Sequence, residues 1–393
     1  MANEQNNIKI LFLSAWYPSR IDPMLGLFVE RHARALATKC KVAVLYVQPV
    51  SQAKQKFESE IRNEGNITEV IIYYRNINFP LIGTFLKAFR YHKSFKKGFR
   101  IIREEFGNFD LIHVNILTRT GVIAYLKKKS SGIPYIITEH WSRYLPLTNT
   151  YKGAFRKFMT KKVVKNASAF TAVTGNLKKA MIVHGLDHHD FRIIPNVVDT
   201  DFFKPAGYKA ERSKKEFIHV SCFEDRSKNI SGILRAVRQL SINRQDFLFR
   251  LIGDGIDSGQ LKNYARLLGI PEDSVTFEGM KTGDELAAYF RNADFLIMFS
   301  NYENMPVVIN EAFASGIPVI STDVGGISEF VNKDNGILVK SGDEKALADA
   351  LNFMLDHIND FDPDELRRHA VEYFSVNAVA EKFLDIYKKV LKK

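Results

Sequence analysis

The sequence predicts an α/β protein made of two Rossmann-like domains, each a parallel sheet with helices on both faces. Short apolar runs alternate with helix-length amphipathic segments along most of the chain, which is typical of parallel strands joined by helices. The alternation stops once, near residue 200, and then restarts. A length of 393 residues also exceeds that of one ordinary core, so two domains are expected.

The first domain is predicted to span residues 1–198. Its buried strands are expected at 8–16, 41–48, 70–74, 110–115, 135–140, 169–174 and 192–196. Pro, Gly and charged residues then interrupt the pattern, which indicates an interdomain linker at 199–216. The second domain, 217–375, is expected to place strands at 217–223, 247–255, 275–279, 294–300, 318–322 and 336–339, before an amphipathic helix at 376–393. The alternative is a single irregular α/β domain.

Composition favours a cytoplasmic globular protein. Hydrophobic residues make up 46% and charged residues 25% of the chain, which argues against disorder. Cys40 and Cys222 lie far apart, so neither a disulfide framework nor a cysteine zinc site is expected. The N-terminal residues lack the basic segment and cleavage site of a signal peptide. No apolar stretch approaches the ~20 residues that span a bilayer.

The net charge of +12 is unevenly distributed, with 31 Lys and Arg against 14 Asp and Glu in residues 1–200 and 25 against 30 in the rest. This excess favours an anionic partner for the first half. Segments 85–106 and 151–165 interleave phenylalanines with lysines and arginines. Basic helices with aromatic anchors suit the anionic surface of a membrane, on which the protein would be peripheral. The alternative is a solvated basic helix whose phenylalanines enter the core.

Ligands bind at the carboxyl ends of the strands in open parallel sheets, so polar residues there are the candidates for a site. They are Ser14, Trp16 and the loop to Gly26, His113, Asn115, Glu139, His140, Thr174 to Asn176, Arg226, Lys228, the turn Gly253 to Gly255, and Asn301 to Pro306. We expect one crevice if the two sheets face each other. His140 could instead be a hydrogen-bonded residue at the core edge, and His113 is a weaker candidate.

The stretch SNYENMPVVINE carries two glutamates with seven residues between them. Pro306 suits the first position of a helix that ends near Ser315. The free N–H groups at the N-terminus of this helix would form an anion site. A diphosphate there would leave Glu311 near a ribose diol and Glu303 near a sugar hydroxyl. Arg226 and Lys228 would meet the same diphosphate. The plainer interpretation leaves Glu303 and the two cations solvated and gives Glu311 only a helix-forming role.

The segment SNYENMPVVINEAFASGIPVISTDVGGISEFV resembles the signature of the retaining GT-B glycosyltransferases of family 4. LIGDG is similar to their glycine turn, PNVVDTDFFKP to their linker, DNGILVKSGDEKALADAL to the segment before their terminal helix, and GLFVERHARAL to their first helix. The resemblance implies the two facing domains of the GT-B fold, with the C-terminal helix returning to the N-terminal domain. It also implies sugar transfer from a nucleotide sugar, UDP favoured over GDP, without a metal or cofactor.

The resemblance implies a role for each matching residue. Glu311 would bind the ribose, Glu303 and His140 the donor sugar, and Lys228 the departing diphosphate. The backbone of Asn304, Met305 and Pro306 would hold sugar and phosphate. Gly26 would let the backbone of the first domain approach the diphosphate, and Gly253 belongs to the glycine turn of the second domain. Phe223 stands where the family usually has an arginine, and Arg226 is the candidate replacement. The loop after the first strand, YPSRIDPMLGLF, contains Gly26 as its one glycine where many members have two.

The acceptor is expected to bind the basic first domain, and the nucleotide sugar the second domain. The acceptor is expected to be a glycan or a polyprenyl-diphosphate-linked sugar, in surface polysaccharide or glycolipid synthesis. The runner-up activity is nucleotide-sugar epimerisation on a similar scaffold. A nucleic-acid-binding protein is a further alternative, although no known nucleic-acid module is present. Asp199-Thr200-Asp201 mimics a metal motif of another glycosyltransferase fold, but it lies in the predicted linker. HGLDHHD fits no standard ligand spacing, and no metal site is predicted.

Overall fold

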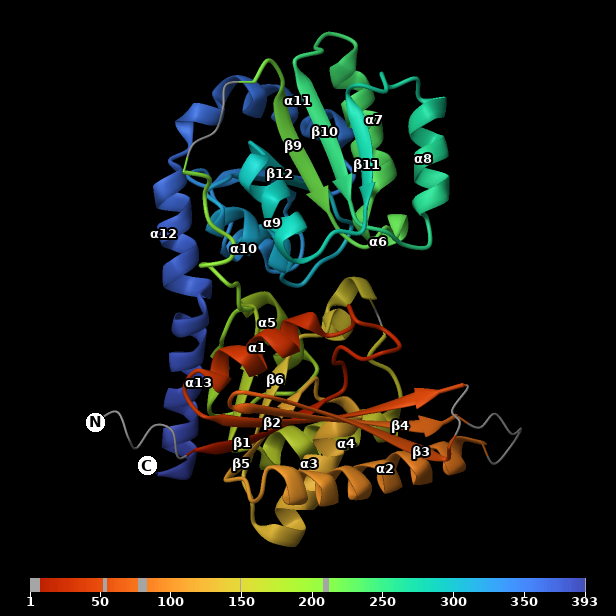
Figure 1. The fold of residues 1–393 in the computed structure, drawn as a ribbon, viewed down its shortest axis with the longest axis vertical. Coiled ribbons are helices and arrows are strands. Elements are labelled where there is room, and N and C mark those ends of the chain that lie inside the picture. Colours follow the sequence, from red (N-terminus) through yellow and green to blue (C-terminus); the bar gives the residue numbers. More distant parts are fainter. Residues whose placement is uncertain (1–7, 52–54, 77–82, 149, 208–211, 393) are drawn as a thin grey trace. The chain divides into compact units, whose positions relative to one another are not determined.

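The computed structural model describes residues 8–51, 55–76, 83–148, 150–207 and 212–392 (Figure 1). The chain divides into two compact units. The first unit takes Met1–Val173, Leu177–Val197 and Val379–Lys393, and the second takes Thr174–Asn176 and Val198–Ala378. None of the helices in the described residues is both long and apolar enough to cross a membrane.

The first unit contains an eight-stranded sheet, counted over the described residues, in the order β3-β4-β2-β1-β5-β6-β7-β8. Its strands are β1 (Lys9–Ser14), β2 (Lys41–Val50), β3 (Phe57–Glu64), β4 (Ile67–Arg75), β5 (Leu111–Asn115), β6 (Tyr135–Glu139), β7 (Ala169–Ala172) and β8 (Phe191–Ile193). All neighbours are parallel except β3 and β4. The chain order reverses between β1 and β5, so this is the topological switch point of the sheet.

Strand β3 was missing from the sequence prediction. Its sequence, FESEIRNE, is charged and largely exposed because the strand lies at the edge of the sheet, paired only with β4. Edge strands often carry charges, which discourage pairing with other chains. An apolar run therefore marks the central strands of this sheet and misses its edge.

Helices cover both faces of the first sheet, as predicted. They are α1 (Leu27–Ala37), α2 (Gly83–Glu105), α3 (Thr118–Ser131), α4 (Ala154–Asn166) and α5 (Gly175–Val183), with short 3-10 helices η2 (Ser142–Tyr144) and η3 (Pro146–Thr148). Helix α1 lies on one face, and α2 and α3 lie on the other (Figure 1).

The C-terminal helix α13 (Val376–Leu391) packs into the first unit from Val379 onward. The Tyr387 hydroxyl lies 2.7 Å from Nδ1 of His113, whose Nε2 lies 2.6 Å from the Thr138 hydroxyl. Phe383 contacts the rings of His113 and His32, at centroid distances of 5.0 and 5.5 Å. The predicted return of the terminal helix is confirmed, and His113 is a core residue that anchors it.

The second unit contains a six-stranded parallel sheet, counted over the described residues, in the order β11-β10-β9-β12-β13-β14. The strands are β9 (Lys215–Val220), β10 (Phe247–Ile252), β11 (Val275–Gly279), β12 (Phe295–Met298), β13 (Val319–Thr322) and β14 (Gly336–Val339). The helices are α6 (Asp225–Lys228), α7 (Ile230–Ser241), α8 (Ser258–Leu267), α9 (Gly283–Asn292), α10 (Val307–Ala314), α11 (Glu344–His357) and α12 (Pro363–Phe374), with η4 (Ile327–Glu329) and η5 (Ile358–Asp360).

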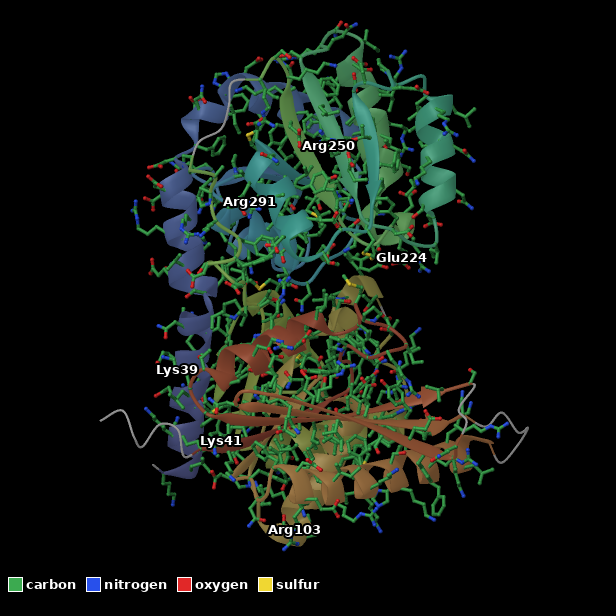
Figure 2. The ribbon with its side chains drawn as sticks, viewed as in Figure 1. Lys39, Lys41, Arg103, Glu224, Arg250 and Arg291 are labelled. Carbon is green, nitrogen blue, oxygen red and sulfur yellow. The ribbon has the colours of Figure 1, made fainter. Side chains whose placement is uncertain are left out.

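Apolar residues occupy the centre of this second sheet, and a row of ion pairs joins three of its neighbouring strands. The rings of Phe217, Phe249 and Phe295 stack on three neighbouring strands at 4.8 to 4.9 Å. Arg250 on β10 lies 2.9 Å from Glu216 on β9 and 2.6 Å from Glu278 on β11 (Figure 2). The chain order reverses between β9 and β12, which makes their carboxyl ends the expected ligand position.

Candidate functional site

Lys228 and Glu303 come together at the switch point of the second sheet. Lys228 ends the one-turn helix α6 after β9, and Glu303 lies in the loop after β12. The Nζ of Lys228 lies 2.5 Å from Oε1 of Glu303, and the Ser300 hydroxyl donates to the same oxygen at 2.9 Å. Burial disfavours the charged form of Lys228, but the Glu303 carboxylate outweighs it and raises the pKa of Lys228. The site therefore holds a permanent cation beside a carboxylate.

Helix α10 begins beside this pair. Pro306 is its N-cap, so the helix starts one residue later than predicted, and it ends at Ala314 before Gly316 adopts a φ of +71°. The loop that carries Glu303 leads directly into this N-terminus, whose first N–H groups have no partner within the helix and provide partial positive charge there. Glu311 is 2% exposed and is therefore not a solvated surface residue of the helix.

The loop before α10 is held by a second glycine turn, whose role the sequence reasoning missed. Gly325 follows β13 with a φ of +64°, and a Cβ there would lie 2.0 Å from the carbonyl oxygen of Glu303. The N–H of Gly326 donates to the carbonyl of Asn304 at 3.0 Å. Thr174, which groups with this unit, donates to the Asn304 side chain at 2.9 Å. Asn304 and Met305 are buried, so their backbone is fixed.

The Gly253 turn packs on the loop after β9. Gly253 has a φ of +136°, and a Cβ would lie 1.9 Å from the Ser221 carbonyl oxygen, so only glycine fits there. Phe223 is 1% exposed and donates its backbone N–H to the carbonyl of Asp254 at 2.9 Å. The position that carries an arginine in the family is thus a buried apolar residue. Arg226 is exposed, and within the described residues its guanidinium has no ion-pair partner.

In the first unit, His140 and Gly26 occupy the loops after β6 and β1. Gly26 is the N-cap of α1 at a φ of +78°, and a Cβ would lie 2.5 Å from the Trp16 carbonyl group. His140 is 8% exposed, its Nε2 lies 3.3 Å from the Asn115 side-chain oxygen, and its ring lies 4.7 Å from that of Phe28. Burial, with smaller effects from neighbouring histidines, lowers the pKa of His140 well below its usual value. The ring is therefore neutral near pH 7.

Glu139 organises the turn that carries His140, which the sequence reasoning did not recognise. Its carboxylate accepts the backbone N–H groups of Leu117 at 3.0 Å and of His140 and Trp141 at 2.9 Å. Burial raises the pKa of Glu139 to about 7, although the three backbone hydrogen bonds oppose the shift. An acidic residue that ends an otherwise apolar strand was the available signal.

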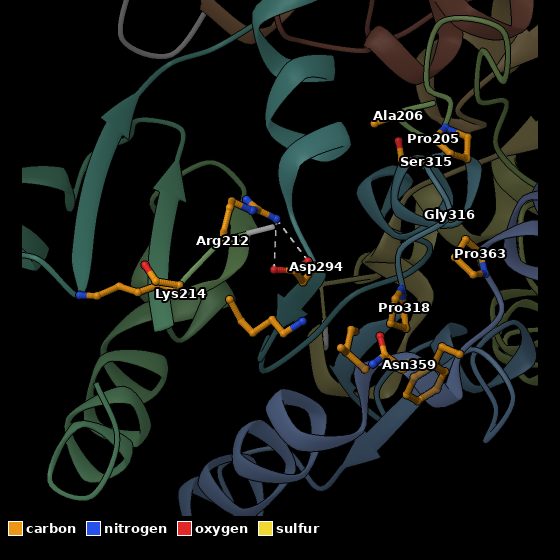
Figure 3. Close-up of a pocket in the computed structure, with 14 residues that line it drawn as sticks. Pro205, Ala206, Arg212, Lys214, Asp294, Ser315, Gly316, Pro318, Asn359 and Pro363 are labelled. Atoms are coloured by element: carbon orange, nitrogen blue, oxygen red, sulfur yellow. Dashed lines mark hydrogen bonds and ion pairs between the residues drawn. The ribbon is translucent and has the colours of Figure 1, made fainter. Parts of the chain in front are cut away.

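A cavity of about 970 Å³ in the second unit lies away from these residues (Figure 3). Lys215 and Pro318, which line it, lie at the amino ends of β9 and β13. Arg212 also lines it and forms an ion pair with Asp294 at 3.3 Å. Because ligands of open parallel sheets bind at the carboxyl ends, this cavity is not the donor site.

Metal-ligand groups are absent from the described part of the chain: no three His, Cys, Asp or Glu side chains there are grouped to hold an ion. In the segment Asp199-Thr200-Asp201, which mimics a metal motif, the Asp199 carboxylate accepts hydrogen bonds from the backbone N–H groups of Asp201 and Phe202, at 3.1 and 3.0 Å. Asp199 therefore caps a turn. Independence of metal stays a prediction.

Two family profiles match the chain. "Glycosyltransferase Family 4" matches residues 25–202, and "Glycosyl transferases group 1" matches residues 202–373. The chain is 26% identical to the putative teichuronic acid biosynthesis glycosyltransferase TuaC of Bacillus subtilis, over 88% of each chain. It is also 26% identical to an MMP α-(1→4)-mannosyltransferase of Mycolicibacterium hassiacum, over 95% of this chain and 88% of that one.

Solved structures share the fold. A sucrose-phosphate synthase from Thermosynechococcus elongatus aligns with a TM-score of 0.75 and 20% identity, covering 98% of this chain and all of that one. Anabaena Alr3699/HepE in complex with UDP aligns with a TM-score of 0.73 and 18% identity, covering 97% of this chain and all of that one.

Proposed function

The chain belongs to the GT-B glycosyltransferases of family 4, and on that premise we propose that it moves a sugar from a nucleoside-diphosphate sugar to an acceptor hydroxyl with retention of anomeric configuration. The observation that carries the proposal is the Lys228–Glu303 pair at the β9/β12 switch point, beside the start of α10. This arrangement offers a cation and helix N–H groups to a diphosphate, with a carboxylate for a sugar hydroxyl.

The proposed reaction breaks the bond between the anomeric carbon and the diphosphate oxygen, and the diphosphate keeps the electron pair. The acceptor oxygen forms the new bond to that carbon, and its proton passes to the departing diphosphate. Charge develops on the leaving group, so Lys228 and the amides before α10 lower the barrier by stabilising it. No step in this scheme needs a metal.

Each remaining site residue takes a supporting role in the proposal. Glu311 accepts hydrogen bonds from the ribose hydroxyls, and because it is buried, water does not compete for its carboxylate. Neutral His140 exchanges a hydrogen bond with the donor sugar. Gly26 admits the donor phosphates to the loop after β1. Arg226 supplies a second cation to the diphosphate when the donor is bound. A UDP-sugar is favoured over a GDP-sugar, and the similarity to a fold solved with UDP supports that choice.

The proposed acceptor is a glycan or a lipid-linked sugar in surface polysaccharide or glycolipid synthesis. The similarity to a teichuronic acid biosynthesis glycosyltransferase supports this class. Helix α4 supports a peripheral membrane contact, because Phe155 and Phe158 are 78% and 61% exposed among lysines. Helix α2 is divided: Phe95 is buried in the core and Phe89 is 49% exposed. The side chain of Phe85 lies outside the described residues.

Thermal stability against UDP, GDP, ADP, CDP and their sugars tests the donor site. A ligand at 100 times its Kd stabilises a fold by about 2.7 kcal/mol. We expect one nucleotide to stabilise the wild type, with most of the effect lost in Glu311→Gln. A panel without any stabilising nucleotide would refute the proposal. Donor turned over to its epimer without acceptor would instead identify an epimerase.

A further inference from the structure

A cavity of about 450 Å³ lies in the first unit at the carboxyl ends of its strands. It is lined by residues that follow β1 and β6 and by residues at the start of α3 and on α4. The members that bear on its chemistry are Trp16, Trp141, Phe155, Arg119, Arg143 and Arg156. Because β1 and β5 form the switch point of this sheet, the cavity occupies the position where such sheets bind ligands.

The charges of this cavity are unbalanced. Its lining contains three arginines and no carboxylate, and none of the three forms an ion pair with a described residue. Nε of Arg143 is buried without a hydrogen-bond partner among the described residues. Burial lowers the pKa of Arg143, and the charges of Arg156 and Arg119 add to the effect. Burial and the neighbouring cations destabilise the charged form of Arg143, and a bound anion would relieve this repulsion.

Aromatic rings form the rest of the binding surface. The rings of Trp16 and Trp141 lie 4.8 Å apart, and the Arg143 guanidinium lies 3.4 Å from the centre of the Trp141 ring. Phe155 lines the cavity and is 78% exposed, so the apolar lining continues to the surface of α4. Such rings pack against the apolar face of a sugar or against a hydrocarbon chain.

We propose that this cavity binds the acceptor, and that the acceptor carries an oxyanion which Arg119, Arg143 and Arg156 hold while its ring or chain packs on the two tryptophans. This inference rests on the proposed function, because it assigns the second substrate of the same reaction. The oxyanion could come from the diphosphate of a lipid-linked sugar or from the carboxylate or phosphate of a soluble glycan. The three arginines fit either source, since guanidinium groups bind both bidentately.

Tryptophan fluorescence tests the inference directly, because the chain has two tryptophans and both line this cavity. The probes are geranyl diphosphate, inorganic diphosphate and methyl glucuronoside, with uncharged methyl glucoside for comparison. We expect the anionic probes to change the emission and methyl glucoside to leave it unchanged. Tighter binding of geranyl diphosphate than of inorganic diphosphate or the glucuronoside would identify a lipid-linked source. The opposite order would identify a soluble glycan.

Variants assign the binding to the arginines. Arg156 has no described contact with either tryptophan, so its replacement should not itself alter their emission. We expect Arg156→Gln to weaken anion binding at least about tenfold, as loss of a charge-assisted hydrogen bond does. Arg143→Gln should do the same, measured by calorimetry because its guanidinium lies on Trp141. Arg103→Gln, at the exposed end of α2, is the matched control with unchanged affinity (Figure 2).

The inference fails if methyl glucoside binds as tightly as the glucuronoside, if no probe binds, or if both cavity variants keep wild-type affinity. Lys228→Gln separates this failure from failure of the proposed function. That variant alters the donor site of the second unit, so it should lose nucleotide stabilisation and keep the fluorescence response. Nucleotide stabilisation without any anion response would overturn this inference and leave the proposed function standing.

Discussion

Replacing Lys228 by methionine tests whether its pair with Glu303 serves catalysis or only the fold. The two side chains are 17% and 11% exposed, so the pair is largely but not fully removed from water. Lys228→Met removes the cation from the Glu303 carboxylate and leaves it the hydrogen bond from the Ser300 hydroxyl. Breaking a buried ion pair costs about 3–5 kcal/mol, and the residual exposure favours the lower end, about 3 kcal/mol. For a unit of this size, that lowers Tm by roughly 6–12 °C.

The double variant Lys228→Met/Glu303→Gln removes both charges and should recover most of the lost stability, because no uncompensated charge stays buried. It should not recover turnover. Loss of one group that stabilises the leaving charge lowers kcat by about 10²–10³. Chemical denaturation and initial rates measure the two effects separately. Lys214→Met is the control, since the Lys214–Asp273 pair is more exposed, and we expect a change within about 0.5 kcal/mol. Near-wild-type turnover in a folded Lys228→Met protein would refute the catalytic assignment.

Three further predictions concern the turn, the buried acid and the membrane contact. Gly325→Ala should lower stability and activity together, because the new Cβ would meet the Glu303 carbonyl at 2.0 Å; unchanged melting and kcat would contradict this. Glu139 has a folded pKa of about 7 against 4.5, so its folded form holds the extra proton, and this contribution to stability is lost as pH rises from 4.5 through 7, by about 3 kcal/mol. Denaturation of wild type and Glu139→Gln across that range should show the wild type losing stability relative to the variant, which cannot titrate at this position, and a constant difference would contradict it. The double variant Phe155→Ser/Phe158→Ser should sediment less with anionic vesicles than the wild type does. Phe353 is an exposed phenylalanine of α11, and Phe353→Ser should leave sedimentation unchanged. Equal binding by the wild type and both variants would refute the membrane proposal.

The central strands could be predicted from the sequence because each is buried on both faces and therefore forms a continuous apolar run. The same reasoning missed β3, whose charged residues satisfy an edge position. Helix boundaries were predicted where a glycine or proline determines the backbone. Gly316 ends α10 as expected, and Pro306 caps that helix where the sequence placed it inside the first turn.

The Lys228–Glu303 contact could not be predicted from local sequence because 75 positions separate the two residues. The contact depends on β9 and β12 being neighbours, and a list of strands does not give their order. The same limit hid the cavity of the first unit, since Trp16 and Trp141 follow β1 and β6, on either side of β5. The resemblance supplied separate roles for Lys228 and Glu303 but not their pairing in the ligand-free chain.

The two sheets place different chemistry at equivalent positions. At the β9/β12 switch point, the largely buried Lys228 and the exposed Arg226 are joined by the amides before α10, which bind phosphate without adding net charge. At the β1/β5 switch point, the cavity relies on three arginines, with no carboxylate in its lining. These three arginines, which we propose bind the acceptor substrate, are part of the excess of cations in residues 1–200, where 31 Lys and Arg stand against 14 Asp and Glu. If that substrate were uncharged, the unpaired cluster around Arg143 would destabilise the fold without serving recognition, and replacing Arg156 by glutamine would stabilise the protein and spare its activity.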